Sequence, residues 1–177
     1  MKKAVFISCF FEKQNPRPLI FYKYLSDVFK TTVVTMDYNH VTKQPVLPPR
    51  QQSFAAKKRA FIKQDAVGSE KQPAPDTVYV PVIKYKSNLS PFRMLSHLLF
   101  SLHLKKIILR EKPDFVYVNF PPNSSAYFAA RAAKKCGAAL MCDLTDLWPE
   151  ALPFRGLLKR VVNFTAGHFW RWLRNKA

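Results

Sequence analysis

Residues 112–150, KPDFVYVNFPPNSSAYFAARAAKKCGAALMCDLTDLWPE, decide the fold class of this chain. Phe115–Asn119 (FVYVN) is a β-rich run, and Asn123 can cap a helix through Ala126–Lys135 that ends at Gly137. Ala138–Asp143 (AALMCD) follows as a second buried strand. A strand, a helix and a strand joined by connections this short predict a right-handed crossover between parallel strands.

The same alternation extends on both sides of this unit. The pattern predicts further strands at Ala4–Phe10, Thr31–Met36 and Thr77–Ile83, and helices at Leu19–Phe29, from Ser90-Pro91 to about Arg110, and from Phe154 to Asn175. Residues 1–177 are therefore predicted to form a single α/β domain: a Rossmann-like open, mainly parallel sheet with helices on both faces. Residues 38–76, which are rich in proline, interrupt the alternation, and we expect a long, mobile insertion there with a short helix around Phe54–Ile62.

Charge is the unusual quantity in the composition. The chain has 29 Lys and Arg against 11 Asp and Glu, a net charge of +18, which favours a negatively charged partner. The candidates are nucleic acid, an anionic membrane surface and phosphorylated ligands. Nucleic acid is the least favoured, because the basic residues are spread along the chain and no nucleic-acid-binding motif is found.

Other classes of protein are not favoured by the residues. The four histidines and three cysteines lack metal-ligand spacing, so we expect no metal site. No GxGxxG, Walker A or GxSxG motif is found, which argues against dehydrogenases, P-loop NTPases and nucleophilic hydrolases. The apolar stretch Met94–Leu109 is broken by charged residues and is shorter than the about 20 residues of a membrane span, so we expect a cytoplasmic protein.

Candidate site residues follow the predicted strands, because ligands of open α/β sheets bind beyond the carboxyl ends of the strands. Asp146 is the candidate catalytic carboxylate, with capping of the next turn as its structural alternative. The candidate substrate-binding residues are Asn15, Arg17, Asn119, Asp143, Trp148 and Glu150. For these, structural roles such as loop packing and capping remain open.

Three features of the sequence carry a resemblance to a known family: Lys112-Pro113-Asp114, Gly137, and Asp146-Leu147-Trp148-Pro149-Glu150. The region resembles the N-terminal domains of glycosyltransferase family 4-like enzymes, which have the GT-B fold. The resemblance implies an acceptor-binding half of a sugar-nucleotide-dependent enzyme of cell-envelope polysaccharide or glycolipid synthesis. It also implies that the donor-binding C-terminal domain is absent and that this chain is inactive by itself.

The resemblance also implies partners. The complete enzyme would use a nucleotide-sugar donor and a lipid-linked or glycan acceptor. No cofactor is expected in this chain. The sequence departs from the family after the first strand, where Asn15-Pro16-Arg17-Pro18 replaces a glycine-rich turn. Arg17 would there supply charge in place of backbone N–H donors.

The final helix is amphipathic, and it leaves two interpretations open. It either packs on the sheet or lies on an anionic membrane, which would place the protein peripherally on the inner membrane face. The alternative function is accordingly a non-catalytic basic α/β module that binds an anionic membrane surface or another polyanion.

Overall fold

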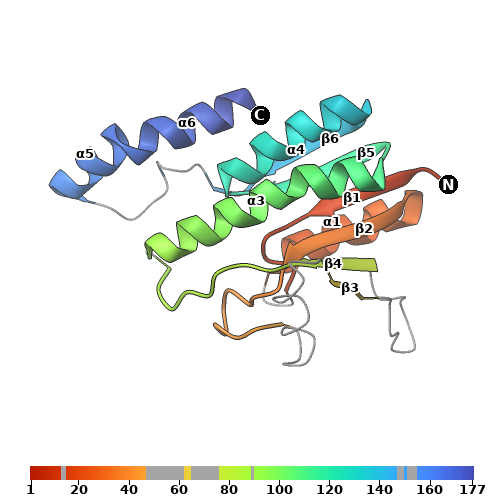
Figure 1. Ribbon diagram of the computed structural model, residues 1–177, viewed down its shortest axis with the longest axis horizontal. Helices are drawn as coiled ribbons and strands as arrows, with labels where there is room; N and C mark the ends of the chain where they lie inside the picture. Colours follow the sequence, from red (N-terminus) through yellow and green to blue (C-terminus); the bar gives the residue numbers. More distant parts are fainter. Residues whose placement is uncertain (13–14, 47–61, 65–75, 89, 147–149, 151–154) are drawn as a thin grey trace.

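A computed structural model describes residues 1–12, 15–46, 62–64, 76–88, 90–146, 150 and 155–177. Its strands are β1 (Lys3–Ile7), β2 (Lys30–Met36), β3 (Ile62–Gln64), β4 (Asp76–Val80), β5 (Phe115–Phe120) and β6 (Ala139–Leu144). Its helices are α1 (Pro16–Val28), α3 (Pro91–Glu111), α4 (Asn123–Cys136), α5 (Gly156–Phe164) and α6 (Ala166–Lys176) (Figure 1).

The strands form one sheet in the order β3-β4-β2-β1-β5-β6. All pairings are parallel except that of β3 with β4, which is antiparallel. From β1 the chain moves outward through β2 to β4, and it then crosses through α3 to β5 on the other side of β1. The strand order therefore reverses between β1 and β5, and in open α/β sheets this is the place where ligands bind.

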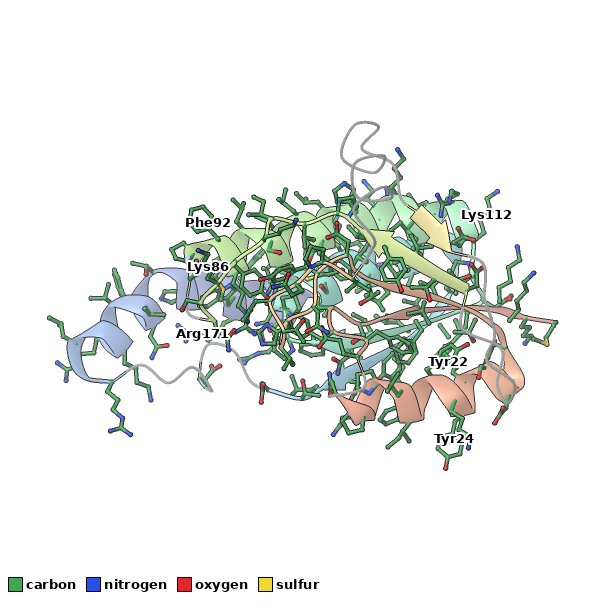
Figure 2. All side chains as sticks on the ribbon, turned by 90° about the horizontal axis from the view of Figure 1, so that it is seen from below. Tyr22, Tyr24, Lys86, Phe92, Lys112 and Arg171 are labelled. Atoms are coloured by element: carbon green, nitrogen blue, oxygen red, sulfur yellow. The ribbon has the colours of Figure 1, made fainter. Side chains whose placement is uncertain are left out.

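Helices cover both faces of the sheet, so the predicted fold class is confirmed. The larger core lies under α3 and α4, where Phe100, Leu104 and Ala129 are fully buried against strand residues such as Val34 and Val118. The opposite face packs on α1 through a smaller aromatic cluster, in which the Phe6 and Tyr117 rings stack at 4.3 Å. Figure 2 shows α3 and α1 on opposite sides of the strands.

Local sequence signals account for the ends of the long helices. Ser90 caps α3, since its hydroxyl accepts a hydrogen bond of 3.1 Å from the Phe92 N–H. Gly137 ends α4 in the left-handed conformation, with φ of 70°, which costs glycine little. β4 ends at Val80, directly before Pro81, because proline cannot donate a ladder hydrogen bond.

Three predictions about these elements are wrong. The single last helix is two helices, because the backbone breaks at Thr165, whose hydroxyl donates to the Val161 carbonyl. Asn123 does not cap α4 but is its first helical residue, and its side-chain amide donates 2.9 Å to the Trp170 carbonyl of α6. β6 is not a buried strand, since Met141 and Leu144 are 43% and 42% exposed.

The expected insertion at residues 38–76 falls mostly outside the described residues. In its described parts, Tyr38 bridges to Pro45, and Ile62–Gln64 adds β3 to the sheet. The short helix expected at 54–62 lies outside the described residues except for Ile62, which begins β3. The division into domains stays a prediction.

Candidate functional site

Asp143 is the centre of a hydrogen-bonded group at the carboxyl ends of β5 and β6. Its carboxylate accepts from Arg17 Nε at 3.0 Å, from Arg17 Nη2, from the Tyr117 hydroxyl at 2.6 Å and from Asn119 Nδ2 at 3.1 Å. Burial acts to raise the pKa of Asp143, but these hydrogen bonds outweigh it and hold the pKa below its usual range. With its acceptor capacity used in this way, Asp143 positions Arg17 rather than taking a proton.

This group joins three of the predicted site residues, Arg17, Asn119 and Asp143, over a sequence separation of 126 residues. Arg17 lies in the first turn of α1, where a positive charge opposes the helix dipole, and Asp143 compensates it. The Arg17 side chain is 52% exposed, whereas that of Asp143 is 5% exposed. Arg17 can therefore meet a bound anion with the edge of its guanidinium that faces away from Asp143.

Sequence reasoning missed Tyr117, although a signal for it exists. Residues two apart in a strand lie on the same face of the sheet, so Tyr117 shares the face of Asn119. Its hydroxyl is held by Asp143, and burial, followed by this hydrogen bond, raises its pKa. Tyr117 is thus a neutral donor at physiological pH.

The remaining predicted residues do not join this group. Asn15 donates 3.2 Å to the Phe10 carbonyl and shapes the loop before α1. Asp146 is exposed beyond β6, and Glu150 pairs with Arg174 of α6 at 3.1 Å. Trp148 lies outside the described residues. The catalytic role of Asp146 and the substrate-binding roles stay predictions.

A second group of side chains lies beyond the carboxyl ends of β1, β2 and β4. We call His40, Lys43, Tyr85 and Arg93 the basic cluster. His40 Nδ1 is 2.8 Å from the Tyr85 hydroxyl, and Lys43 Nζ is 5.0 Å from the centroid of the Tyr85 ring. The carboxylate of Glu12 accepts 2.8 Å from the backbone N–H of His40 and so holds this loop against β1.

Burial and mutual repulsion disfavour the positively charged forms of the side chains in the basic cluster. Burial lowers the pKa of His40 to about 4, and the charges of Arg93 and Lys43 act in the same direction. Burial and then Arg93 lower the pKa of Lys43, and burial lowers the pKa of Arg93. The carboxylate of Glu12 acts to raise the pKa of Lys43 and that of Asp146 acts to raise the pKa of Arg93, but neither offsets the lowering. A bound anion would therefore stabilise the charged forms of Lys43 and Arg93.

The titration of His40 predicts a pH dependence of stability. Its pKa falls from 6.5 to about 4 on folding, so the unfolded chain binds more protons between these values. We expect the free energy of unfolding to decrease as the pH falls from 6.5 towards 4, and His40→Gln to flatten this part of the profile. Urea unfolding of both proteins at each pH measures the difference, and parallel profiles would contradict the assignment to His40.

A cavity of about 300 Å³ lies between α3 and α6, at the start of α4. Its walls are mainly apolar, and the residues that line it are Met94, Leu95, His97, Leu98, Pro122, Ser124, Phe169, Trp170 and Leu173. The hydroxyl of Ser124 is hydrogen-bonded to the hydroxyl of Ser101, with 2.8 Å between the two oxygens. Burial lowers the pKa of His97 well below its usual value, so its ring is a neutral wall of this cavity.

The described residues hold no group of three or more His, Cys, Asp or Glu side chains placed to bind a metal ion. Cys9 lies beside the basic cluster but is not an activated nucleophile. Burial raises the pKa of its thiol to about 12, although Ser125 and Arg93 act to lower it.

Comparisons with known proteins identify no family. No protein-family model and no curated protein matches the chain. Among solved structures, pantoate-beta-alanine ligase from Francisella tularensis, complexed with beta-gamma ATP and beta-alanine, is 15% identical with a TM-score of 0.39. The match covers 98% of this chain and 69% of that one. Two structures of pantothenate synthetase from Thermus thermophilus are 10% and 9% identical with TM-scores of 0.41, and the matches cover all of this chain and 65% of those chains.

The glycosyltransferase assignment is contradicted by these comparisons, because these three solved structures are pantothenate synthetases and not GT-B enzymes. The acceptor-domain role, the nucleotide-sugar donor and polysaccharide synthesis are withdrawn with it, and the alternative of a non-catalytic basic module gains no support. The physical reason is that a strand-helix-strand unit recurs in many unrelated proteins, so a short motif after it does not specify a reaction. At TM-scores this low, the likeness to pantothenate synthetase carries no argument about activity either.

Proposed function

We propose that this chain works at an anionic membrane surface, to which it binds peripherally through the outer face of α5 and α6. The observation that carries the proposal is the exposure of five large apolar side chains on these helices. We call them the docking face: Leu157 (76% exposed), Val161 (50%), Phe164 (78%), Phe169 (50%) and Trp172 (47%).

Exposure of this size is costly in water. Burying one large apolar side chain gains about 1.5–3 kcal/mol, and the exposure of five on adjoining helices is typical of an interaction surface. Aromatic rings beside basic residues suit the boundary between lipid headgroups and hydrocarbon. The free energy of the docking face is therefore lower at the surface of a bilayer than in water.

The charges around the docking face favour an anionic bilayer. Arg155, Lys159 and Arg160 are exposed on or beside α5, and neither α5 nor α6 contains an acidic residue. Each Lys or Arg near an anionic surface contributes about 1 kcal/mol to binding. The cytoplasmic leaflet carries the anionic lipids, so the proposal places the protein on that leaflet.

The two helices are fixed to the domain, which keeps the docking face in one orientation. Leu173 of α6 is 3% exposed, and the Trp172 ring lies 5.2 Å from that of Tyr127 on α4. Arg171 donates 2.9 Å to the Asn163 carbonyl and so links α6 to α5. Among the helices that the structure describes, none is long and apolar enough to cross a membrane, so the association proposed is with the surface.

Vesicle sedimentation tests the proposal. We expect the protein to bind phosphatidylglycerol vesicles, to bind phosphatidylcholine vesicles at least about tenfold more weakly, and to lose affinity as salt is raised. Lys159→Glu with Arg160→Glu should reduce binding about tenfold or more. The matched control is Lys105→Glu with Lys106→Glu, an exposed adjacent pair further along α3, which changes the net charge equally.

Three outcomes would contradict the proposal. They are no binding to anionic vesicles, binding that is the same at low and high salt, and equal losses in the two charge-reversal variants. The last result would mean that the overall charge of +18, and not the docking face, attracts the vesicles. A dimer that forms through α5 and α6 without vesicle binding would assign this face to a second copy of the chain instead.

A further inference from the structure

The cavity between α3 and α6 adjoins the docking face. Phe169 belongs to both, since it lines the cavity and is 50% exposed. On the other wall, Leu95 of α3 lines the cavity and is 42% exposed, and Phe92, one turn earlier, is 59% exposed. The cavity therefore reaches the surface at a rim of apolar side chains from α3 and α6.

The basic cluster lies next to His97, one of the residues that line the cavity. His97 lines the cavity, and its ring is 5.7 Å from that of Phe10, which stacks on His40 at 4.3 Å. Arg93 precedes His97 by four residues on α3, so both lie on the same side of that helix. Its guanidinium is 6.0 Å from the centroid of the Phe10 ring. Lys43 is reached through Tyr85, whose ring is 6.5 Å from that of His97 and 5.0 Å from Lys43 Nζ, and both Lys43 and Arg93 donate hydrogen bonds to Asn88. The two cations thus lie next to the His97 wall of the cavity, although neither lines the cavity itself.

We infer that the cavity accepts one hydrocarbon chain of an anionic membrane lipid, whose phosphate lies against Arg93 and Lys43. The inference rests on the proposed membrane association, because the docking face would bring the rim of the cavity to the bilayer. Its volume of about 300 Å³ is at the lower end of small-molecule sites, about 300–1,000 Å³, and suits a single chain. The mainly apolar wall binds the methylene groups of the chain that the cavity can enclose, and the cations select the anionic headgroup.

The charge of the headgroup site supports an anion rather than a neutral sugar or a choline. Lys43 and Arg93 each lose solvent on folding, and the charge of Arg93 further disfavours that of Lys43. A phosphate between them would remove this repulsion. Figure 2 shows Lys86, a further exposed lysine, at the same end of the molecule as Phe92.

The test uses soluble probes, which separate the cavity from the membrane. Calorimetry with decyl phosphate below its micelle concentration should show binding at least about tenfold tighter than inorganic phosphate and than decyl maltoside. Leu98→Trp, which fills the cavity, should remove the advantage over inorganic phosphate. Leu102→Trp on the exposed side of α3 (50% exposed) is the matched control and should leave it unchanged. Arg93→Gln should remove the advantage over decyl maltoside.

Vesicle binding of the same variants distinguishes the inference from the proposed function. Leu98→Trp should still bind phosphatidylglycerol vesicles, because the docking face is intact. If Leu98→Trp binds decyl phosphate as tightly as the wild type, the inference is overturned while the membrane proposal stands. If decyl phosphate binds as expected but vesicles do not, the membrane proposal fails instead. Should Leu98→Trp not fold, Leu98→Phe is the smaller cavity-filling variant and must weaken decyl phosphate binding, whereas the volume-conserving Leu98→Met must leave it nearly unchanged.

Discussion

Leu157→Glu with Phe164→Glu is expected to lower affinity for phosphatidylglycerol vesicles by about 100-fold or more. The two side chains are the most exposed of the docking face, at 76% and 78%, so they would insert most deeply. Losing two apolar insertions costs about 3 kcal/mol or more at about 1.5 kcal/mol each, and about 1.4 kcal/mol is tenfold in affinity. The introduced carboxylates also repel the anionic lipid. Sedimentation over a lipid titration measures the change.

A matched control exists on the opposite face of the sheet. Ile20 (54% exposed) and Val28 (65% exposed) of α1 are apolar and exposed to a similar degree. Ile20→Glu with Val28→Glu changes the net charge by the same amount and should retain most of the binding. Figure 2 shows Tyr24 on the outer side of α1, far from the end that carries Phe92. If both pairs weaken binding equally, the affinity reflects charge alone, and the docking face has no special role.

Asp143→Ala is expected to destabilise the fold by about 2–4 kcal/mol. Asp143 is 5% exposed, and its removal leaves the hydroxyl of Tyr117 (2% exposed) and the amide of Asn119 (7% exposed) without their acceptor. Losing the partner of a buried polar group costs about 1–3 kcal/mol for each group. Arg17→Ala should cost less than about 1 kcal/mol, because that side chain is half exposed and its charge is screened by solvent. Urea unfolding at pH 7 compares the two.

The pH profile of a second variant, Asp143→Asn, provides the control. The pKa of Asp143 is lower in the folded protein than its ordinary value of 3.8, so its contribution is complete above about 3.8. It is lost as the pH falls through the folded pKa, where the carboxylate becomes protonated. The stability difference between the wild type and Asp143→Asn should therefore shrink at acid pH. A larger loss for Arg17→Ala than for Asp143→Ala would show that the ion pair, and not the buried hydrogen bonds, dominates.

Local signals were sufficient for most elements of the fold. The β-branched run Thr31–Met36 became β2, and Ser90-Pro91 started α3, because strand propensity and helix capping act within a few residues. The break at Thr165 could not be predicted in this way. The apolar periodicity continues through it on both sides, so the pattern does not show that α5 and α6 are separate helices, of which α6 packs on α4.

The candidate site was predicted in part. Arg17, Asn119 and Asp143 were expected at strand ends, and parallel topology brings such ends to one edge of the sheet. The basic cluster was missed because His40 and Lys43 fall in a stretch assigned to an insertion. Their neighbours Tyr85 and Arg93 come from another loop and helix, and no spacing rule connects residues 45 positions apart.

The sequence by itself determined the alternation of strands and helices, the parallel sheet and the high positive charge, since these follow from propensity, periodicity and composition. Only the tertiary structure decided which groups meet. The ion pair of Arg17 with Asp143, the cavity between α3 and α6 and the exposure of Leu157 and Phe164 all depend on long-range packing. An apolar helix face has the same sequence pattern whether it is buried or exposed, and only its neighbours in space decide which of the two it is.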